Sequence, residues 1–348
     1  MRKSLLAILS LGAIFAGPLR AQTLYVDAQR GQPASTGSAA APLASLDQAV
    51  TLAQQFSGRE PVVLRLAPGL YTLTRPQELK TSLPAAADTV RYTLEATVMP
   101  DDTAWTPTKM PVIQSVSPNN STYHFAHAIG LLVAKGNVRF RGLKFVGNAN
   151  PAVKNYYPIT RENEELLGLT ISQCYFVGER NSAPIQGALW AHGAGDIRVD
   201  HSIFYECKNA LIIGVKSRRG FSVTHCVIYG AYEAAIWFDP NEATFTGFAF
   251  RNNIVAGGGY VWINDEHTTA NFTLRNSLIT NNEHYTGYYT GTELLPTLNH
   301  HVEQGVQKQG TVRLRRVKTE GLPPDYLNPL PQSAGYGLHA GIFITRKP

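Results

Sequence analysis

The stretch Gly220-Phe-Ser-Val-Thr-His-Cys-Val-Ile-Tyr-Gly230 decides the fold, because five other stretches of the chain repeat its pattern. Each begins as an alternating strand, passes a small or polar residue, continues with two apolar residues and ends in a turn. The six stretches begin at Asn137, Gly168, Asp196, Gly220, Gly247 and Asn271. Their starts lie 31, 28, 24, 27 and 24 residues apart. A repeat of this length is typical of a solenoid.

Aligning the six stretches gives columns of equivalent residues. The second and fourth positions are apolar, and this period of two predicts a strand with one buried face. A later column is again large and apolar, and consists of Phe145, Phe176, Phe204, Ile228, Val255 and Ile279. The column two positions before it is mostly small or polar, and consists of Leu143, Cys174, Ser202, Cys226, Asn253 and Ser277. We expect a corner here, where side chains stack and share hydrogen bonds along the column.

A third short strand completes each turn of the solenoid. These strands are expected at residues 188–191, 210–213, 234–237 and 261–264. Three strands in a turn of about 24 residues, each parallel to its counterpart in the next turn, predict an all-β, single-domain parallel β-helix. Because the ends of a solenoid need caps, residues 45–55 are of interest: their apolar residues have helical spacing and Ser45 is a suitable N-cap. We expect a short capping helix there.

The N-terminus predicts export. Arg2 and Lys3 precede an apolar run over residues 5–16, and a small residue precedes a cleavage site after Ala21. The protein is therefore expected to be secreted or periplasmic. No later stretch reaches the roughly 18 unbroken apolar residues of a spanning helix, so we expect no membrane span.

These features divide the chain into a signal peptide and one continuous domain. The signal peptide covers residues 1–21 and the domain covers 22–348. Within the domain, residues 22–126 form the N-terminal cap and first coils, and residues 127–348 form the β-helix rungs and the closing segment. We expect the domain to be a monomer.

Charge and cysteine usage narrow the classes of partner. Removing the signal peptide lowers the formal net charge from +6 to +3, which favours an anionic ligand slightly and gives no reason to expect nucleic acid. Cys174 and Cys226 share a column with one rung between them, which places them ~10 Å apart and beyond disulfide reach. We interpret both as buried spacers, whereas the sequence leaves the state of Cys207 open.

The opening and closing segments extend the pattern into a family resemblance. Residues 25–27, a Gly/Ser-rich loop, Pro42–Ala49 and Leu66–Tyr71 resemble the start of secreted right-handed parallel β-helix proteins of the pectate-lyase-like superfamily. Asp325–Gly335 resembles the closing segment often found in the same group. The resemblance implies the fold across nearly the whole mature chain. It leaves the reaction open, because the superfamily includes polysaccharide lyases, glycoside hydrolases, esterases, epimerases and proteins without known activity.

Ligands of a solenoid usually lie along a surface formed by one strand of every rung. In the third strand, alternation is expected to turn outward Leu211, Ile213, Trp237, Trp262 and Asn264. It is expected to turn inward Ala188, Trp190, Ala210, Ile212, Ala234, Ile236, Val261 and Ile263. Two outward tryptophans on adjacent rungs would form a flat platform for sugar rings. The alternative is that Trp237 and Trp262 pack beneath residues 285–289 or the C-terminal strands.

The turns after the third strands carry the candidate polar groups. They are His192, Lys216, Arg218, Arg219, Asp239, Asn241, Glu242, Asn264, Asp265, Glu266 and His267. A lyase needs a base and a cation, for which Lys216, Arg218 and Arg219 are candidates. Calcium, if the reaction needs it, would bind Asp239, Asp265 or Glu266.

The same turns fit other functions. A glycoside hydrolase would pair Asp239 with Asp265 or Glu266. In either enzyme, Trp237, Trp262, Asn264, His192 and His267 are the candidate substrate-binding residues. The third possibility is a surface ladder of ion pairs with little energetic value.

Two histidines stand apart from this surface. His201 and His225 share a column with Gln173, Asn252 and Asn276, so we interpret them as structural hydrogen-bonding residues. The sequence thus favours a secreted carbohydrate-active protein, with a lyase-like enzyme on an acidic glycan as the leading hypothesis. A glycoside hydrolase on the same scaffold and a non-catalytic glycan-binding protein are the alternatives.

Overall fold

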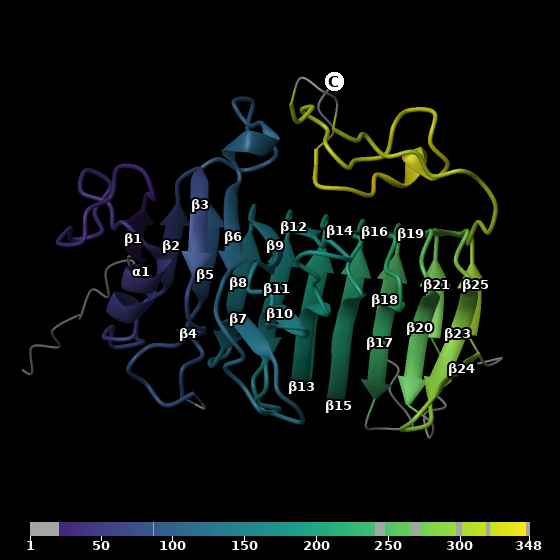
Figure 1. Cartoon of the computed structure of the whole chain (residues 1–348), viewed down its shortest axis with the longest axis horizontal. Helices are drawn as coiled ribbons and strands as arrows, with labels where there is room; N and C mark the ends of the chain where they lie inside the picture. The colour runs from purple at the N-terminus through teal and green to yellow at the C-terminus, as the bar shows by residue number, and fades with distance from the viewer. Residues whose placement is uncertain are drawn as a thin grey trace, which may run out of the picture.

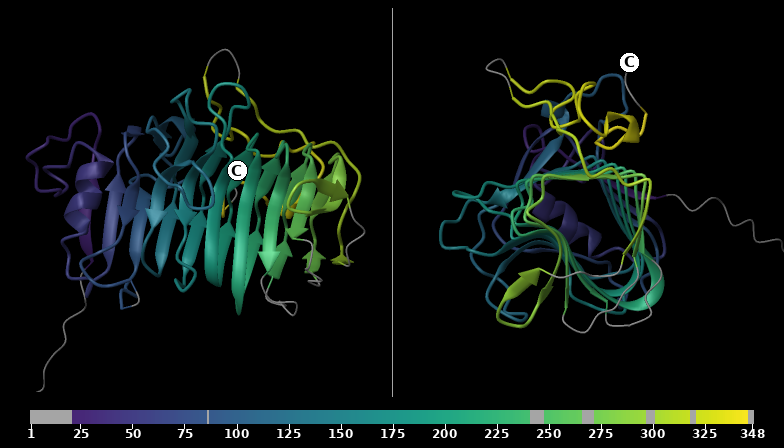
Figure 2. Two further views of the ribbon diagram at one scale, coloured as in Figure 1. Left: turned by 60° about the horizontal axis from the view of Figure 1, so that its bottom comes forward. Right: turned by 90° about the vertical axis from the view of Figure 1, so that its right-hand side faces the viewer.

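The structure is a computed structural model that describes residues 21–85, 87–240, 248–265, 272–296, 301–317 and 321–345. The expected signal peptide, residues 1–21, lies almost wholly outside this range. The described chain winds into a parallel β-helix, in which the coils stack along one axis (Figure 1). Seen from its end, each coil has three sides (Figure 2). We call these sides the first, second and third face.

The first face contains the strands that begin the sequence repeats. Neighbours pair in parallel throughout, and the strands in order are β1 (Gln22–Val26), β2 (Val62–Leu66), β5 (Tyr92–Ala96), β8 (Val138–Arg141), β11 (Leu169–Ser172), the second half of β13 (Gly187–Asp200), the second half of β15 (Asn209–Thr224), β18 (Phe248–Arg251), β21 (Phe272–Arg275) and β25 (His301–Gln304).

The second face is a separate parallel sheet. It contains β3 (Gly69–Leu73), β6 (Pro111–Ser115), β9 (Lys144–Asn148), β12 (Tyr175–Val177), β14 (Ile203–Tyr205), β16 (Val227–Tyr229), β19 (Ile254–Ala256) and β22 (Leu278–Thr280).

The third face contains β4 (Gln77–Leu79), β7 (Ala128–Val133), β10 (Tyr156–Arg161), the first halves of β13 and β15, β17 (Ala234–Pro240), β20 (Tyr260–Asp265) and β23 (His284–Tyr289). A short strand, β24 (Leu294–Pro296), pairs with β23 in the antiparallel direction. In β13 and β15 the third-face strand runs without interruption into the first face of the next coil, which the sequence did not predict. A register shift between Gly193 and Gly195 marks this passage.

The interior follows the columns that the sequence predicted. Phe145, Phe176 and Phe204 stack in line, with ring centroids 4.8 and 4.9 Å apart. In the polar column, Asn253 Oδ1 accepts from the backbone N–H of Cys226 at 2.8 Å, and Ser277 Oγ accepts from that of Asn253 at 3.1 Å. The corner is therefore held by hydrogen bonds between successive rungs, as expected. Cys174, Cys207 and Cys226 are buried free thiols.

The capping helix is also confirmed. Helix α1 (Leu46–Ala53) begins at Ser45, whose hydroxyl accepts from the Gln48 N–H, while the Gln48 side chain accepts from the Ser45 N–H. This reciprocal capping box satisfies two donors at the helix start. The apolar side of α1 packs on the main core, and the helix lies across the N-terminal end of the coils (Figures 1 and 2).

The C-terminal segment, described over residues 308–317 and 321–345, returns along the outside of the second face (Figure 1). This segment contains a 3₁₀ turn at Tyr336–Leu338. Elsewhere in the chain, a 3₁₀ turn at Pro107–Lys109 precedes β6. Leu314, Leu327 and Ile342 pack on the outward apolar row formed by Tyr175, Ile203, Val227, Ile254 and Leu278. Among the described residues there is no helix with the length and apolar character needed to cross a bilayer.

Candidate functional site

A groove of about 560 Å³ lies along the outside of the third face. We call it the third-face groove. Its floor comes from β13 and β15, one wall is the loop before β7, and the other wall comes from β17 and β23. The residues that line it include His124, Phe125, Tyr157, Gln186, Trp190, His192, Lys208, Asn209, Ile212, Gly214, Glu233, Trp237 and Tyr289. Aromatic rings and a small set of polar groups therefore meet in one concave surface, which is the usual make-up of a ligand site.

One wall is an aromatic loop that comes before β7. A bridge between Ser121 and His127 closes this loop, so that its tip projects over the third face. Phe125 stacks on Trp190 at 5.9 Å and 15°, and remains 42% exposed. Tyr157 of β10 packs on the same indole at 4.6 Å. The loop thereby covers most of Trp190 and offers its own rings to the groove.

The other wall contains Trp237 and Tyr289. Their rings meet edge-to-face at 5.4 Å, and Trp237 is half-buried. Both expectations for Trp237 are met in part, because it points outward and also packs against β23.

The polar floor is centred on the carboxylate of Glu233. Lys208 Nζ lies 3.0 Å from Glu233 Oε1, and Asn209 Nδ2 donates to Oε2 at 2.6 Å. Asn209 also donates to the Gln186 carbonyl at 3.1 Å. Its own Oδ1 has no protein partner although the residue is fully buried. A buried acceptor without a partner is costly, and Asn209, unlike Asn264, belongs to the lining of the groove, so a small movement of the groove floor would let a ligand donate to this oxygen.

His192 adds a neutral imidazole to the groove. It lies on β13 opposite Gly214, where a Cβ would stand 2.9 Å from the His192 Nδ1. Its Nε2 is buried without a partner. Burial, together with the nearby His124 and Arg161, lowers the pKa of His192 to about 4. The ring is therefore uncharged at neutral pH.

Arg161 lies behind His192 as a fully buried cation. Its Nε donates to the His192 carbonyl at 2.9 Å, whereas Nη1 and Nη2 have no protein partner. Burial lowers the pKa of Arg161 to about 10, and Asp196 opposes this shift. The guanidinium thus stays charged at neutral pH and adds positive potential near the groove.

The outward orientation predicted for Trp262 is wrong, whereas the alternative of packing against residues 285–289 is met at Tyr285, whose ring lies 5.6 Å from the indole. Trp262 is 2% exposed and belongs to the main core. In the strand register, Ile236 pairs with Trp262 while Trp237 pairs with Ile263, so the two indoles point to opposite sides of the sheet. Asn264 is likewise 2% exposed, in register with buried Phe238. Neither Trp262 nor Asn264 is open to a ligand.

The same error affects the strands before it. Trp190 and Ile212 share the row of Trp237 and face the groove, although alternation was expected to turn them inward. Leu211 and Ile213 are fully buried, although they were expected to point outward. Hydrophobicity on both sides of these strands hides their orientation, because the groove side is aromatic and apolar too.

For most of the charged candidates the structure describes the backbone without the side chain, or does not describe the residue at all. Lys216, Arg218 and Arg219 belong to the backbone of β15, two to five residues beyond Gly214, and their side chains are not described. Asp239 lies on β17 in the register row of His192 and Gly214, and Asp265 ends β20; their side chains are likewise not described. Asn241, Glu242, Glu266 and His267 lie outside the described residues.

Sequence reasoning missed the aromatic loop, Tyr157, Lys208, Asn209 and Glu233. The run Tyr123-His-Phe-Ala-His127 offered a signal, since four aromatic or imidazole rings in five residues are unusual for a solvated loop. The stacking of His201 and His225 was predicted correctly: their rings lie 4.5 Å apart at 12°.

Comparisons with known proteins concern the fold. A family described as "Right handed beta helix region" matches residues 114–299, more than half of the chain. No curated protein matches the sequence. Among solved structures, a GH136 lacto-N-biosidase from Eubacterium ramulus is similar with a TM-score of 0.41 and 11% identity, over 82% of this chain and 55% of that one. A rhamnogalacturonan lyase is similar with a TM-score of 0.35 and 12% identity, over 92% and 99%. The chain spans little more than half of the lacto-N-biosidase.

Proposed function

This chain belongs to the right-handed β-helix family, and on that premise we propose that it is an exported polysaccharide lyase-like enzyme that binds an acidic glycan in the third-face groove. The observation that carries the proposal is the groove itself: aromatic walls around buried polar atoms that lack protein partners. The N-terminal segment with Arg2, Lys3 and the apolar run 5–16 supports export.

The groove suits a sugar chain. Sugar rings have apolar C–H faces and polar edges, so they pack on aromatic rings while their hydroxyls need hydrogen-bond partners. Phe125, Trp237 and Tyr289 offer the first kind of surface. Asn209 Oδ1 and His192 Nε2 offer the second, because each is a buried polar atom with unused hydrogen-bonding capacity.

Positive charge favours a uronate. Arg161 is a buried cation behind the groove, and Lys208 lies on its floor beside Glu233. The basic segment Lys216–Arg219 continues the same strand from Gly214. Because buried charges act through a lower effective dielectric than water, Arg161 contributes more to the potential in the groove than a surface cation would.

The proposed reaction is a β-elimination. A base removes the proton next to the uronate carboxylate and a cation stabilises the resulting enolate. The C–O bond to the leaving sugar then breaks, its electrons stay on the leaving oxygen, and that oxygen takes up a proton from the protonated base or from water. His192 is in the neutral form that accepts a proton. Lys216, Arg218 and Arg219 are the proposed stabilising cations and alternative bases. If calcium takes part, Asp239, Asp265 and Glu266 are its proposed ligands.

A panel of uronate-containing and neutral polysaccharides tests the proposal. Growth of ultraviolet absorbance from an unsaturated product supports the lyase, whereas new reducing ends without that absorbance would replace it by a hydrolase. Binding with neither signal would leave a glycan-binding protein. His192→Gln should lower kcat at least about 100-fold, the typical contribution of general base catalysis. The exposed His284→Gln, on β23, is the matched control and should keep full activity.

Trp237→Ala separates binding from chemistry. Because the indole forms a wall of the groove, its removal should raise KM with a smaller effect on kcat. A basic-segment variant, in which Lys216, Arg218 and Arg219 are replaced by Gln, should abolish β-elimination. Unchanged lyase activity in that variant would remove these residues from the mechanism.

A further inference from the structure

A second polar site lies at the corner between the first and second faces, away from the groove. Here each coil turns through a residue in the left-handed backbone region, with φ between 42° and 57° at Gln173, His201, His225, Asn252 and Asn276. Non-glycine residues are uncommon in this region, and Asn and His are among the more tolerant. The corner thus aligns side chains of successive coils at the spacing of the β-strands.

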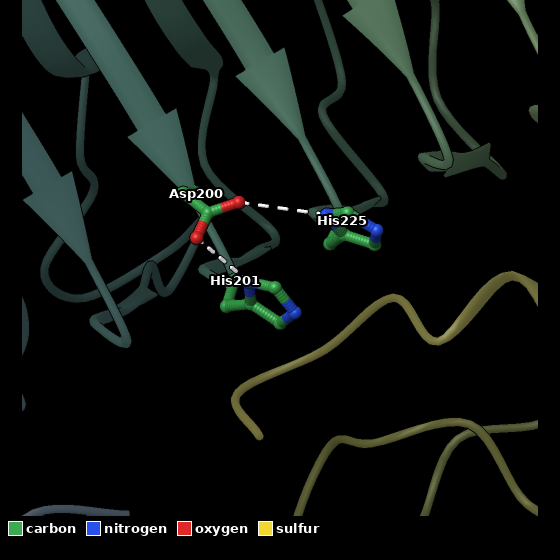
Figure 3. A group of neighbouring side chains, drawn as sticks. All are labelled: Asp200, His201 and His225. Carbon is green, nitrogen blue, oxygen red and sulfur yellow. Dashed lines mark hydrogen bonds and ion pairs between the residues drawn. The ribbon is translucent and has the colours of Figure 1, made fainter. Parts of the chain in front are cut away.

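Two imidazoles and one carboxylate meet at this corner. Asp200 ends β13 and directly precedes His201. His201 Nδ1 lies 2.7 Å from Asp200 Oδ2, and His225 Nδ1 lies 3.5 Å from Oδ1 (Figure 3). One donor atom from each of the three residues lies within 4.8 Å of the others. Both histidines therefore turn the same ring atom toward one carboxylate group.

Asp200 is the acidic residue of its register row that directly precedes a corner histidine. The other described residues in register with it along the first face are Tyr25, Arg65, Glu95, Arg141, Ser172, Thr224, Arg251, Arg275 and Gln304. The second carboxylate of this row, Glu95, is paired with Arg65 and Arg141 instead of with histidines. The other described corner residues named above carry amides instead of imidazoles. One acidic side chain thus coincides with the two adjacent histidines, whereas an ordinary corner needs neither.

The hydrogen bonding within the group is incomplete. His225 Nδ1 is buried and has no hydrogen-bond partner, since 3.5 Å from Asp200 is too long. The Asp200 carboxylate has hydrogen bonds with His201 Nδ1 at 2.7 Å and Thr224 Oγ1 at 2.5 Å. It therefore faces a second imidazole nitrogen, that of His225, which it does not satisfy.

We propose that Asp200, His201 and His225 bind a divalent first-row transition cation, with Zn²⁺ as the representative ion. Imidazole nitrogen and carboxylate oxygen are the donors that such ions prefer. Donor atoms at ~2.1 Å from a tetrahedral zinc lie about 3.4 Å from one another. The nitrogen–oxygen separations of 2.7 and 3.5 Å, and a separation of at most 4.8 Å between the two imidazole donors, need only side-chain movements to reach this value.

Binding through Nδ1 determines where the ring proton of each histidine lies. Each histidine binds as a neutral imidazole through Nδ1, so its ring proton resides on Nε2. At His225 this proton meets the side-chain amide of Asn252, whose nitrogen lies 2.9 Å from Nε2. A half-turn of that amide presents its oxygen as the acceptor, and such an outer partner fixes the orientation of a ligating histidine. Three protein donors leave further positions on the ion for water.

The site lies where the C-terminal segment docks. The Gly341 N–H donates to the His225 carbonyl at 2.9 Å, and Gln173 Nε2 donates to the Ile342 carbonyl at 3.0 Å. An ion held between the coils of His201 and His225 would fix the surface that receives this segment. Since the ion binds only the folded arrangement, it should raise the thermal stability of the protein.

Titration of the tag-free, chelator-treated chain tests the proposal. Co²⁺ is followed by its visible absorption and Zn²⁺ by calorimetry, and we expect one ion per chain. His225→Gln, His201→Gln and Asp200→Asn should each weaken binding at least tenfold. The histidine variants should fold because Gln173 and Asn252 already occupy equivalent corners, and Asp200→Asn should fold because uncharged Ser172 and Thr224 lie in register with Asp200. Circular dichroism checks that all three do. His284→Gln is the control and should bind as the unaltered protein does.

A second measurement does not depend on affinity alone. Zn²⁺ should raise Tm by several degrees in the unaltered protein, EDTA should reverse the rise, and the three variants should not respond. Absence of binding by the unaltered protein, or equal binding by all variants, would overturn the proposal. Neither measurement depends on glycan cleavage, so the proposed enzyme and the proposed metal site stand or fall separately.

Discussion

At the scale of single residues, the imidazole of His192 has room in the groove only because Gly214, opposite it, has no side chain. The His192 ring occupies the space above Gly214, and a Cβ there would lie 2.9 Å from the ring nitrogen. Gly214→Ala should therefore displace the imidazole and weaken glycan binding about tenfold, while stability changes by only about 1 kcal/mol. Affinity measurements and urea denaturation check the two parts. Gly337→Ala, with no atom near its added Cβ, should change neither. Normal binding by Gly214→Ala would contradict the proposed role of His192.

The pKa of His192 also predicts a pH dependence of stability. Its value of about 4 in the folded protein lies below the ordinary value of about 6.5. Between these values the unfolded chain binds more protons, so the stabilising contribution is complete above pH 6.5 and is lost as the pH falls toward 4. Urea midpoints at pH 4.5 and 7 should differ less in His192→Gln than in the unaltered protein. An equal pH dependence in both would argue against a buried neutral imidazole.

At the scale of elements, a buried ion pair joins the loop after β4 to the end of β7. Lys135 Nζ lies 3.0 Å from Asp88 Oδ1, and both side chains are at most 1% exposed. Asp88 also accepts from Thr81 Oγ1 at 2.6 Å, and Lys135 Nζ donates to the Gly136 carbonyl at 2.9 Å. The pair thus fixes a loop that has no strand of its own to hold it.

Breaking this pair should be costly. Lys135→Met leaves the Asp88 carboxylate buried without its cation, for which we expect a loss of about 3–5 kcal/mol in the free energy of unfolding. Adding Asp88→Asn should recover much of it, because the uncompensated charge disappears. Lys80→Met removes the exposed partner of Glu78 and should cost less than about 1 kcal/mol. Equal costs for the two lysines by urea denaturation would refute the argument.

The elements also show what sequence periodicity can predict. The six repeats place first-face and second-face strands correctly, because the inward apolar columns recur in every repeat and, on the first face, alternate with mostly polar outward positions. In the third-face strands, inward and outward positions do not differ in hydropathy. Trp190 and Trp237 point outward and Trp262 inward, and all three are apolar. Their orientation depends on strand register between coils, which the loops of different length determine. The groove itself depends on a loop from one coil that covers the strands of others, and no local pattern indicates such a contact.

At the scale of the whole molecule, the C-terminal segment acts as a lid on the second face. It covers the outward apolar row of Tyr175, Ile203, Val227, Ile254 and Leu278. A chain that ends after Gly310 should expose this row, bind a hydrophobic dye, melt at a lower temperature and aggregate more readily. Dye fluorescence and thermal melting check this expectation. An unchanged Tm without dye binding would mean that the contacts of the segment contribute little to folding.

The two ends of the coil have a consequence for self-association. A stack of parallel rungs has open strand edges at both ends, and such edges can template the addition of another chain. Helix α1 lies across the first end, where its apolar side is already occupied by the core. At the other end, β24 pairs with β23 in the antiparallel direction. A further parallel rung cannot continue the third-face ladder beyond that strand. The sequence repeat alone would allow further coils to be added. The antiparallel strand Leu294–Pro296 prevents this on the third face and so ends that ladder.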